Sequence, residues 1–300
     1  MGRIFSPGKL LLTSEYTVLD GALALAVPTK PGQEFFYEEK PDGNSTVLWE
    51  AYHQDKLWLS AEIDYQRWQV LDANIPESAA FILNVLKNVQ KFSSEKFQSN
   101  SDYYLKTNLQ FPPDFGLGSS STLMNNLAEW ANIDPFVLNE ESLGGSGYDV
   151  AVAMEKSALL YQLFSERKIE TLTYNPAFKD KLIFIHLNQK QDSREGIRLY
   201  RSKEKSADLI HFFSNITKQV VGADSINHFS ELMTVHEARL SEFLGLPTVK
   251  EKLFPDCHVF VKSLGAWGGD FVMSRKFSGF EDYFSEKGFT TILNWDSLID

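Results

Sequence analysis

The chain has 300 residues, which allows either one large domain or two domains of roughly 100–200 residues each. Its 43% hydrophobic and 23% charged residues are typical of a globular protein and exclude a disordered or fibrous chain. A net charge of −11 argues against a general binder of nucleic acids or anionic membranes, so an anionic ligand must be held locally.

The cellular compartment is indicated by cysteine usage and by hydropathy. No stretch approaches the roughly 18 consecutive apolar residues of a membrane span. The single cysteine, Cys257, can form no internal disulfide and supplies no thiolate cluster, which fits a reducing compartment. We therefore expect a cytoplasmic protein without a nucleic-acid or membrane partner. We also expect a monomer or a homodimer, and the glycine motifs of the chain imply a small-molecule substrate.

The first half of the chain alternates between two-residue and three- or four-residue hydrophobic spacing, which predicts both strands and helices. Pro112-Pro113 ends the last strand of this half. The expected strands lie at 10–13, 16–19, 23–27, 47–51, 57–63 and 105–111, and the expected helices at 76–92 and 123–131.

The second half continues the mixture. A short helix at 148–152 leads to a domain boundary that we expect at 175–181, around Pro176. The further expected strands lie at 158–164, 170–174, 182–187, 257–262 and 289–295, and the further helices at 203–221 and 226–243. Interleaved strands and helices favour the α+β class. We expect an N-terminal domain over 1–175 and a C-terminal domain over 182–300.

Four glycine-containing runs could carry chemistry, at 6–21, 113–122, 144–153 and 263–271. In the second run a strand is followed by glycine and serine and then by a helix. This order predicts an anion site, because backbone N–H groups converge there and the helix dipole adds positive potential. A Walker A loop, a dinucleotide fingerprint and an HExxH metal motif are all absent from the sequence.

The four runs together resemble the superfamily of galactokinase, homoserine kinase, mevalonate kinase and phosphomevalonate kinase (the GHMP kinases), over nearly the whole length. The first motif matches at Pro7-Gly8-Lys9 and Ser14-Glu15-Tyr16, with serine in place of the usual glycine at 14. The second matches at Pro112 and Gly116 to Ser120. The third, GAGGGD, matches at Gly265 to Asp270 with Trp267 replacing a glycine, and residues 146–149 (SGYD) are similar to the segment with the catalytic aspartate.

This resemblance implies a fold and a set of residue roles. It implies an N-terminal domain like domain 2 of ribosomal protein S5 and a ferredoxin-like C-terminal domain, with ATP and Mg²⁺ as cofactors. The implied catalytic residues are Lys9 and Asp149, with Asp149 accepting a proton and Lys9 holding it ionised; a plain salt bridge between the two is the alternative. The implied nucleotide-binding residues are Pro112, Gly116, Leu117, Gly118, Ser119, Ser120 and Ser121.

Metal and acceptor contacts are also implied. Magnesium would be held by the hydroxyl of Ser120 or its neighbour Ser119, with Glu140, or the adjacent Glu141, as the candidate carboxylate; an exposed helix end is the other interpretation of these glutamates. Residues 187–198 form a charged loop that either clamps an anionic substrate group or is simply solvated. The candidate substrate contacts are Glu15, Tyr16, Ser146, Gly147, Lys190, Ser193, Arg194, Gly265 and Ala266.

The predicted function is phosphoryl transfer from ATP to a mevalonate-pathway intermediate, with phosphomevalonate ahead of mevalonate. Three alternatives stay open: a decarboxylase similar to diphosphomevalonate decarboxylase, a sugar or homoserine kinase, and a relative that binds nucleotide without turnover. Release of carbon dioxide would select the first of these, and tight ATP binding without ADP formation the last.

Overall fold

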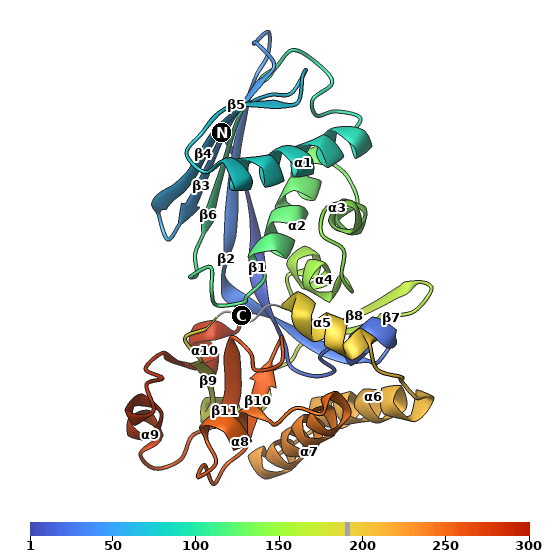
Figure 1. The fold of residues 1–300 in the computed structure, drawn as a ribbon, viewed down its shortest axis with the longest axis vertical. Helices are drawn as coiled ribbons and strands as arrows, with labels where there is room; N and C mark the ends of the chain where they lie inside the picture. The colour runs from blue at the N-terminus through green and yellow to red at the C-terminus, as the bar shows by residue number, and fades with distance from the viewer. Residues whose placement is uncertain (190–192) are drawn as a thin grey trace. The chain divides into compact units, whose positions relative to one another are not determined.

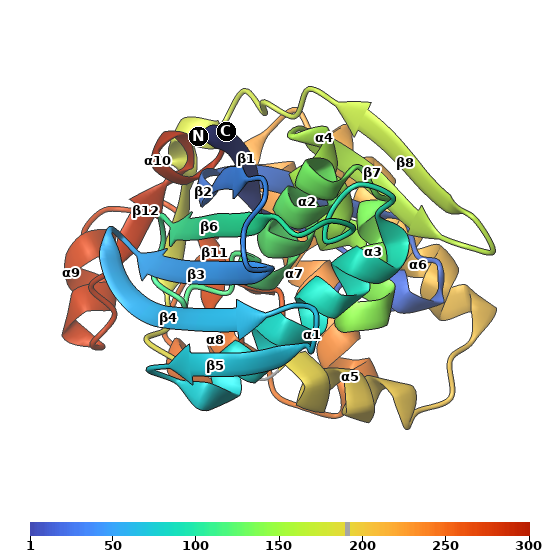
Figure 2. The same cartoon turned by 90° about the horizontal axis from the view of Figure 1, so that it is seen from above.

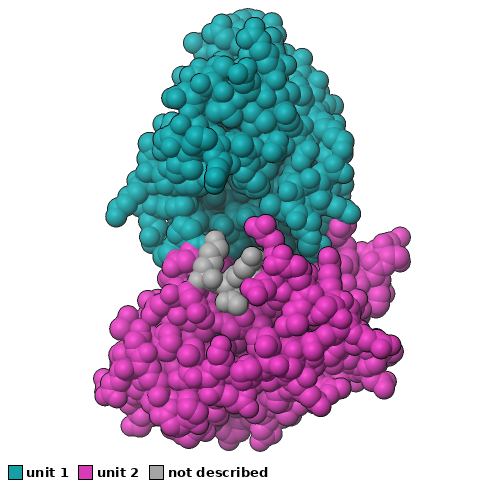
Figure 3. All heavy atoms as spheres, viewed as in Figure 1, with its two compact units in different colours: residues 1–8, 31–113, 117–156 teal, residues 9–30, 114–116, 157–300 magenta. Residues whose placement is uncertain are grey.

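The computed structural model describes residues 1–189 and 193–300 (Figure 1). Its internal contacts divide the chain into two compact units, coloured separately in Figure 3. Unit 1 comprises residues 1–8, 31–113 and 117–156, and unit 2 comprises residues 9–30, 114–116 and 157–300. Both units contain helices and a sheet, as the α+β class requires. The last change of unit along the chain falls after Lys156, and the domain boundary expected at 175–181 stays a prediction.

Unit 1 is a sheet covered on one face by helices (Figures 1 and 2). Its strands follow the order β5-β4-β3-β6-β2, in which β3 and β6 are parallel and the other neighbours antiparallel. The strands are β1 (Gly2–Leu11), β2 (Ala24–Lys40), β3 (Thr46–His53), β4 (Lys56–Asp64), β5 (Gln69–Ala73) and β6 (Asp102–Leu109). The helices are α1 (Pro76–Phe92), α2 (Ser119–Ala131), α3 (Pro135–Ser142) and α4 (Tyr148–Glu155). Strands β1 and β2 begin in one unit and end in the other.

The core of unit 1 lies between the sheet and the helices. Val47, Trp49 and Ala51 alternate as the buried face of β3 and pack with Ile82 and Leu86 from α1. Helix α1 has the bounds that the three- and four-residue spacing predicted, with a proline in its first turn.

Unit 2 contains a four-stranded antiparallel sheet in the order β10-β11-β9-β12. Its strands are β9 (Leu182–His186), β10 (Val261–Leu264), β11 (Phe271–Arg275) and β12 (Ile292–Asn294). The helices are α5 (Ser193–Arg201), α6 (Ala207–Val221), α7 (Ile226–Leu244), α8 (Val249–Leu253), α9 (Phe280–Glu286) and α10 (Trp295–Leu298), with 3₁₀ turns η1 (Thr17–Asp20) and η2 (Lys179–Lys181). The hairpin of β7 (Ala158–Leu163) and β8 (Arg167–Leu172) pairs with residues 24–26 of β2.

Several expected elements differ from the structure. The strand expected at 289–295 is limited to Ile292–Asn294, because Trp295 begins helix α10. The strand expected at 16–19 is replaced by the 3₁₀ turn Thr17–Asp20, because Ser14 and Tyr16 adopt positive φ angles of 65° and 61° that reverse the chain. The strand expected at 257–262 is shifted to Val261–Leu264. The charged loop expected at 187–198 is helical from Ser193 onward. In the described part of the chain, no helix is both long and apolar enough to cross a bilayer.

Candidate functional site

The glycine-serine run turns sharply into helix α2. Gly116 and Gly118 have φ angles of 65° and 89°, a conformation that residues with a side chain rarely adopt. Gly118 is the N-cap of α2, and among the described residues no side chain caps this end. The N–H groups of the first helical turn therefore face outward in the way that anion-binding turns require.

A pocket of about 480 Å³ opens in unit 1 beside the start of this helix. Ser119 and Ser120 are among its lining residues, and Ser120 is exposed. The rest of the lining is mostly apolar and comes from the sheet's inner face and from α1: Trp49, Ala51, Leu59, Phe81 and Ile82. An apolar pocket next to an anion-binding turn suits a ligand with a flat, poorly charged end and an anionic end.

Aromatic and polar groups complete the pocket. The rings of His53 and Trp58 stack at 4.6 Å, and both line the pocket, as does the carboxylate-bearing Glu77. Sequence reasoning missed these residues because they come from two strands and a helix whose alternating or helical spacing predicts only a core.

Segment 114–116 is anchored within unit 2. Nζ of Lys9, a half-buried side chain, donates a hydrogen bond of 2.9 Å to the carbonyl of Gly116. On the other side, a Cβ added to Gly116 would lie 1.8 Å from a carboxylate oxygen of Asp270. Phe115 packs against the rings of His186 and Phe271, at 4.6 and 5.1 Å. Lys9 of the first motif and Asp270 of the third motif therefore both lie next to Gly116, the first glycine of the second motif.

The other predicted nucleotide residues surround this turn. Leu117 is fully buried and Pro112 half-buried, and a nucleotide-binding role for either residue stays a prediction. The hydroxyl of Ser121 donates to the carbonyl of Gly118 at 2.9 Å, which closes the turn from within and leaves Ser119 and Ser120 as the hydroxyls at the pocket.

Asp149 lies in the first turn of α4, after Gly147, whose φ is 84°. It is half-buried, and its Oδ1 accepts a hydrogen bond of 3.0 Å from the N–H of Val150. Ser146, just before this turn, is buried. Asp149 belongs to unit 1 and Lys9 to unit 2, so their pairing stays a prediction.

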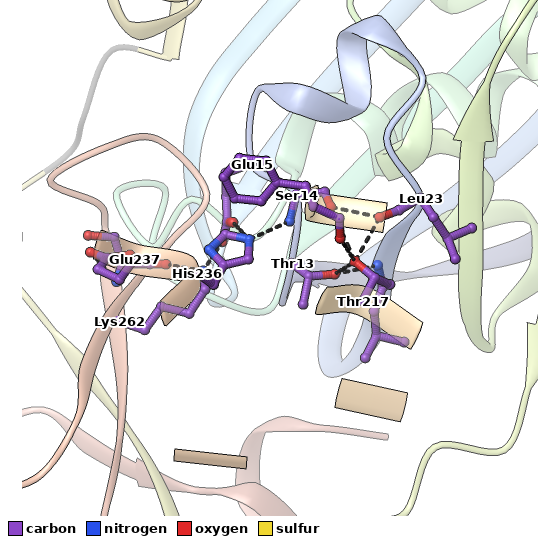
Figure 4. A network of polar contacts seen from close by, with 11 residues as sticks. Thr13, Ser14, Glu15, Leu23, Thr217, His236, Glu237 and Lys262 are labelled. Atoms are coloured by element: carbon purple, nitrogen blue, oxygen red, sulfur yellow. Dashed lines mark hydrogen bonds and ion pairs between the residues drawn. The ribbon is translucent and has the colours of Figure 1, made fainter. Parts of the chain in front are cut away.

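Glu15 lies in a buried polar network of unit 2 (Figure 4). Its side chain is 3% exposed and forms an ion pair with Lys262, which is fully buried. His236 and Glu237 of α7 complete the cluster of titratable groups, and the N–H of Ser263 donates to Glu237 at 3.2 Å. Sequence reasoning placed Glu15 at the substrate and gave no role to the other three residues.

Burial controls the protonation of this network. It raises the pKa of Glu15, an effect that Lys262 opposes. Burial also raises the pKa of Glu237 to about 7, with Lys262 lowering it and Glu15 adding to the rise. The pKa of His236 is well below its usual value because burial and Lys262 both disfavour its charged form. One lysine therefore serves two buried carboxylates, and His236 is neutral.

The third motif forms a turn after β10. Gly265 has a φ of 77°, and the buried Ala266 accepts a hydrogen bond of 2.8 Å from the N–H of Gly269. Trp267 packs in a cluster with Tyr16 and Tyr200, and its indole N–H donates to the carbonyl of Pro247 at 3.2 Å. The tryptophan that departs from the motif thus supplies core contacts.

The expected anion clamp is only partly visible. Lys190 lies outside the described residues, Ser193 is the first residue of α5, and Arg194 is exposed on that helix. The magnesium candidate Glu140 is exposed on α3, while its neighbour Glu141 pairs with Lys91 at 2.8 Å. The described ranges contain no cluster of three or more His, Cys, Asp or Glu that could hold a metal.

Comparison with solved structures shows the same fold in small-molecule kinases. Phosphomevalonate kinase of Streptococcus pneumoniae, in complex with phosphomevalonate and AMPPNP, is similar at a TM-score of 0.72 and 17% identity, covering 98% of this chain and 100% of that one. Mevalonate kinase of Methanococcus jannaschii is similar at 0.69 and 16% identity, with 98% and 97% coverage. Galactokinase of Lactococcus lactis, in complex with galactose, is similar at 0.68 and 13% identity, with 97% and 92% coverage.

No family model matches this chain, and no curated protein matches it in sequence. At 13–17% identity the structural likeness shows the fold, and it extends over nearly the full length of both partners in each comparison.

Proposed function

We propose that this chain is an ATP-dependent phosphotransferase of the GHMP kinase type, acting on a small molecule. The observation that carries the proposal is the glycine-serine turn at 116–121, which enters α2 beside an apolar pocket. The pocket would take the nucleotide base, and the N–H groups of the turn would hold its phosphates. The fold shared with solved small-molecule kinases supports the same activity.

The residue roles follow from what phosphoryl transfer requires, which is positioning and neutralisation of charge. With an alcohol acceptor such as mevalonate, Asp149 would accept the proton of the attacking oxygen. The attacking phosphate oxygen of phosphomevalonate is mostly ionised at pH 7, so there Asp149 would orient the acceptor. Lys9, held at Gly116, would stabilise charge on the transferring group. The resemblance of the motifs to the GHMP kinases further implies an N-terminal domain like domain 2 of ribosomal protein S5 and a ferredoxin-like C-terminal domain.

The oxygen ligands that the protein offers near the pocket suit Mg²⁺ only when the phosphates of the nucleotide supply further ligands. Mg²⁺ prefers oxygen ligands and is usually held by one or two carboxylates plus substrate phosphates. The exposed hydroxyl of Ser120 at the pocket is such an oxygen, and Glu140 remains the carboxylate candidate. When bound, the ion would neutralise charge on the phosphates.

The acceptor that we propose is phosphomevalonate, or else mevalonate. Support comes from the motifs SEYTVL, SGYD and GAWGGD and from Arg194 as a partner for an anionic acceptor group. The test is ADP release measured with purified protein, ATP and Mg²⁺ across mevalonate, phosphomevalonate, homoserine, galactose and diphosphomevalonate. ADP release that depends on mevalonate or phosphomevalonate is expected. Release only with galactose or homoserine would refute the acceptor, and carbon dioxide release with diphosphomevalonate would select the decarboxylase.

A further inference from the structure

The turn of the first motif holds two residues in a conformation that side chains disfavour. Ser14 and Tyr16, on either side of Glu15, have φ angles of 65° and 61°. Backbone of this kind persists only where surrounding contacts hold it, and it is common at functional sites. The contacts that hold this turn therefore show what its buried polar groups do.

Ser14 is fixed by two helices. Its N–H donates to Nε2 of His236 in α7 at 2.8 Å, so this nitrogen is the acceptor and the imidazole is neutral. Its hydroxyl donates to the carbonyl of Leu23 at 2.6 Å and lies 3.2 Å from the hydroxyl of Thr217 in α6 (Figure 4).

Glu15 is fixed by the sheet of unit 2. Its Oε1 accepts from Nζ of Lys262 in β10, and the same ammonium donates to the carbonyl of Ser263 at 2.8 Å. Oε2 of Glu15 lies 3.4 Å from His236. Oε2 has no hydrogen-bond partner among the described residues, but it is enclosed by buried protein groups, and at 3% exposure the side chain offers a substrate little surface.

Tyr16 connects the turn to helix α5 and to the loop that carries Trp267. Its hydroxyl accepts from the N–H of Trp267 at 2.6 Å, and its ring stacks on Tyr200 of α5 at 5.8 Å. A Cβ added to Gly196 of α5 would lie 2.1 Å from the Tyr16 hydroxyl. Only glycine lets α5, which also carries Arg194, pack this closely on the turn.

We infer that Glu15 and Lys262 are a buried positioning pair: they hold the strained turn 14–16 so that Tyr16 seats helix α5 and the loop of Trp267. Glu15 is then not a substrate ligand, although its motif suggests one. The kinetic part of this inference rests on the proposed kinase activity, whereas the pairing itself does not.

The pairing is tested by a double-mutant cycle in the full chain. Removing one partner of a buried ion pair leaves an uncompensated charge, whereas replacing both by neutral groups is often tolerated. Glu15→Gln and Lys262→Met should each raise the equilibrium constant for unfolding by roughly 10²–10³-fold. The double variant should unfold at a higher denaturant concentration than either single variant. Exposed Glu62→Gln and Lys252→Met serve as the matched control cycle and should show no coupling.

Kinetics then separate positioning from substrate contact. A positioning pair predicts that the double variant recovers kcat relative to both single variants and keeps an acceptor KM within about threefold of wild type, a difference of under 1 kcal/mol. If Glu15 instead contacted the substrate, Glu15→Gln should keep the wild-type unfolding midpoint and raise the acceptor KM at least tenfold. Adding Lys262→Met should then not restore the acceptor KM. That result would overturn the inference.

Two further arms cover loss of folding and loss of activity. If neither single variant folds, a folded double variant supports the pair and an unfolded one contradicts it. Gly196→Ala should raise the acceptor KM and leave the ATP KM unchanged; an unchanged acceptor KM would refute the link to α5. If wild type forms no ADP with any acceptor, the proposed function fails, while the unfolding cycle still decides whether the pair exists.

Discussion

The buried carboxylate of Glu237 should make stability depend on pH in a way that one substitution reveals. Glu237 is 3% exposed, and the charges of Lys262 in β10 and Glu15 in the strained turn act on it, while the N–H of Ser263 donates to it. Burial raises its pKa from the usual 4.5 to about 7. At 1.36 kcal/mol per pKa unit, this gap corresponds to about 3 kcal/mol of destabilisation when the folded protein is forced to ionise the group.

The direction of the effect follows from which state holds the proton. The folded state keeps the Glu237 proton up to about pH 7, whereas the unfolded state releases it near 4.5, so this stabilising contribution is full below 4.5 and lost as the pH rises through 7. His236 acts in the opposite direction, because the folded state keeps it neutral while the unfolded state binds a proton below its usual 6.5. Its contribution is therefore full above 6.5 and lost on acidification. Below pH 6.5 the contributions of Glu237 and His236 therefore change with pH in opposite directions.

Glu237→Gln removes one of the two opposing groups. The variant should match wild type below pH 4.5 and be more stable by up to about 3 kcal/mol at pH 8. Urea unfolding of wild type, Glu237→Gln and the exposed control Glu231→Gln, also on α7, at pH 5, 6.5 and 8 measures this difference. A Glu237→Gln difference that is the same at all three values would refute the raised pKa, and an equal pH trend in the control would assign the effect to general charge.

Three other variants test the site. Gly116→Ala should weaken ATP binding at least about tenfold, because the added Cβ would clash with Asp270 at a residue whose φ is already positive. Gly144→Ala is the control, since Gly144 has a similar φ of 73° and open space around it. Equal ATP affinities of the two variants, measured by calorimetry, would contradict the expectation. Asp149→Asn should keep ATP binding but lower kcat by about 10²–10⁴-fold, and a folded variant with wild-type kcat would rule out the proton-accepting role. Arg194→Ala should raise the acceptor KM by roughly 10–100-fold, which corresponds to the loss of one hydrogen bond to a charged group. The ATP KM is the internal reference and should not change. An unchanged acceptor KM would exclude Arg194 as a clamp for the acceptor.

Local patterns in the sequence predicted the local parts of this structure. The spacing of apolar residues gave helix α1 its bounds, and the strand-glycine-helix order located the turn at 116–121. Both features depend on residues that are neighbours in the chain. The α+β class followed from the same patterns.

Contacts between distant residues could not be predicted in this way. Glu15 and Lys262 are 247 positions apart, and Ser14 and His236 are 222 apart. A lysine in an apolar strand and a histidine in a helix carry no local sign of such partners. The strand expected at 16–19 failed for the same reason, since the positive φ angles of that turn are held by these remote groups.

The central claim is that this chain transfers the γ-phosphoryl group of ATP to a small-molecule acceptor. Phosphorus NMR of purified protein with ATP, Mg²⁺ and phosphomevalonate or mevalonate tests it most directly, with protein-free and acceptor-free samples as controls. The claim predicts that the γ-phosphate signal of ATP is replaced by ADP and by a new signal from the phosphorylated acceptor. Formation of ADP with inorganic phosphate alone, or unchanged ATP with every acceptor in the panel, would contradict it.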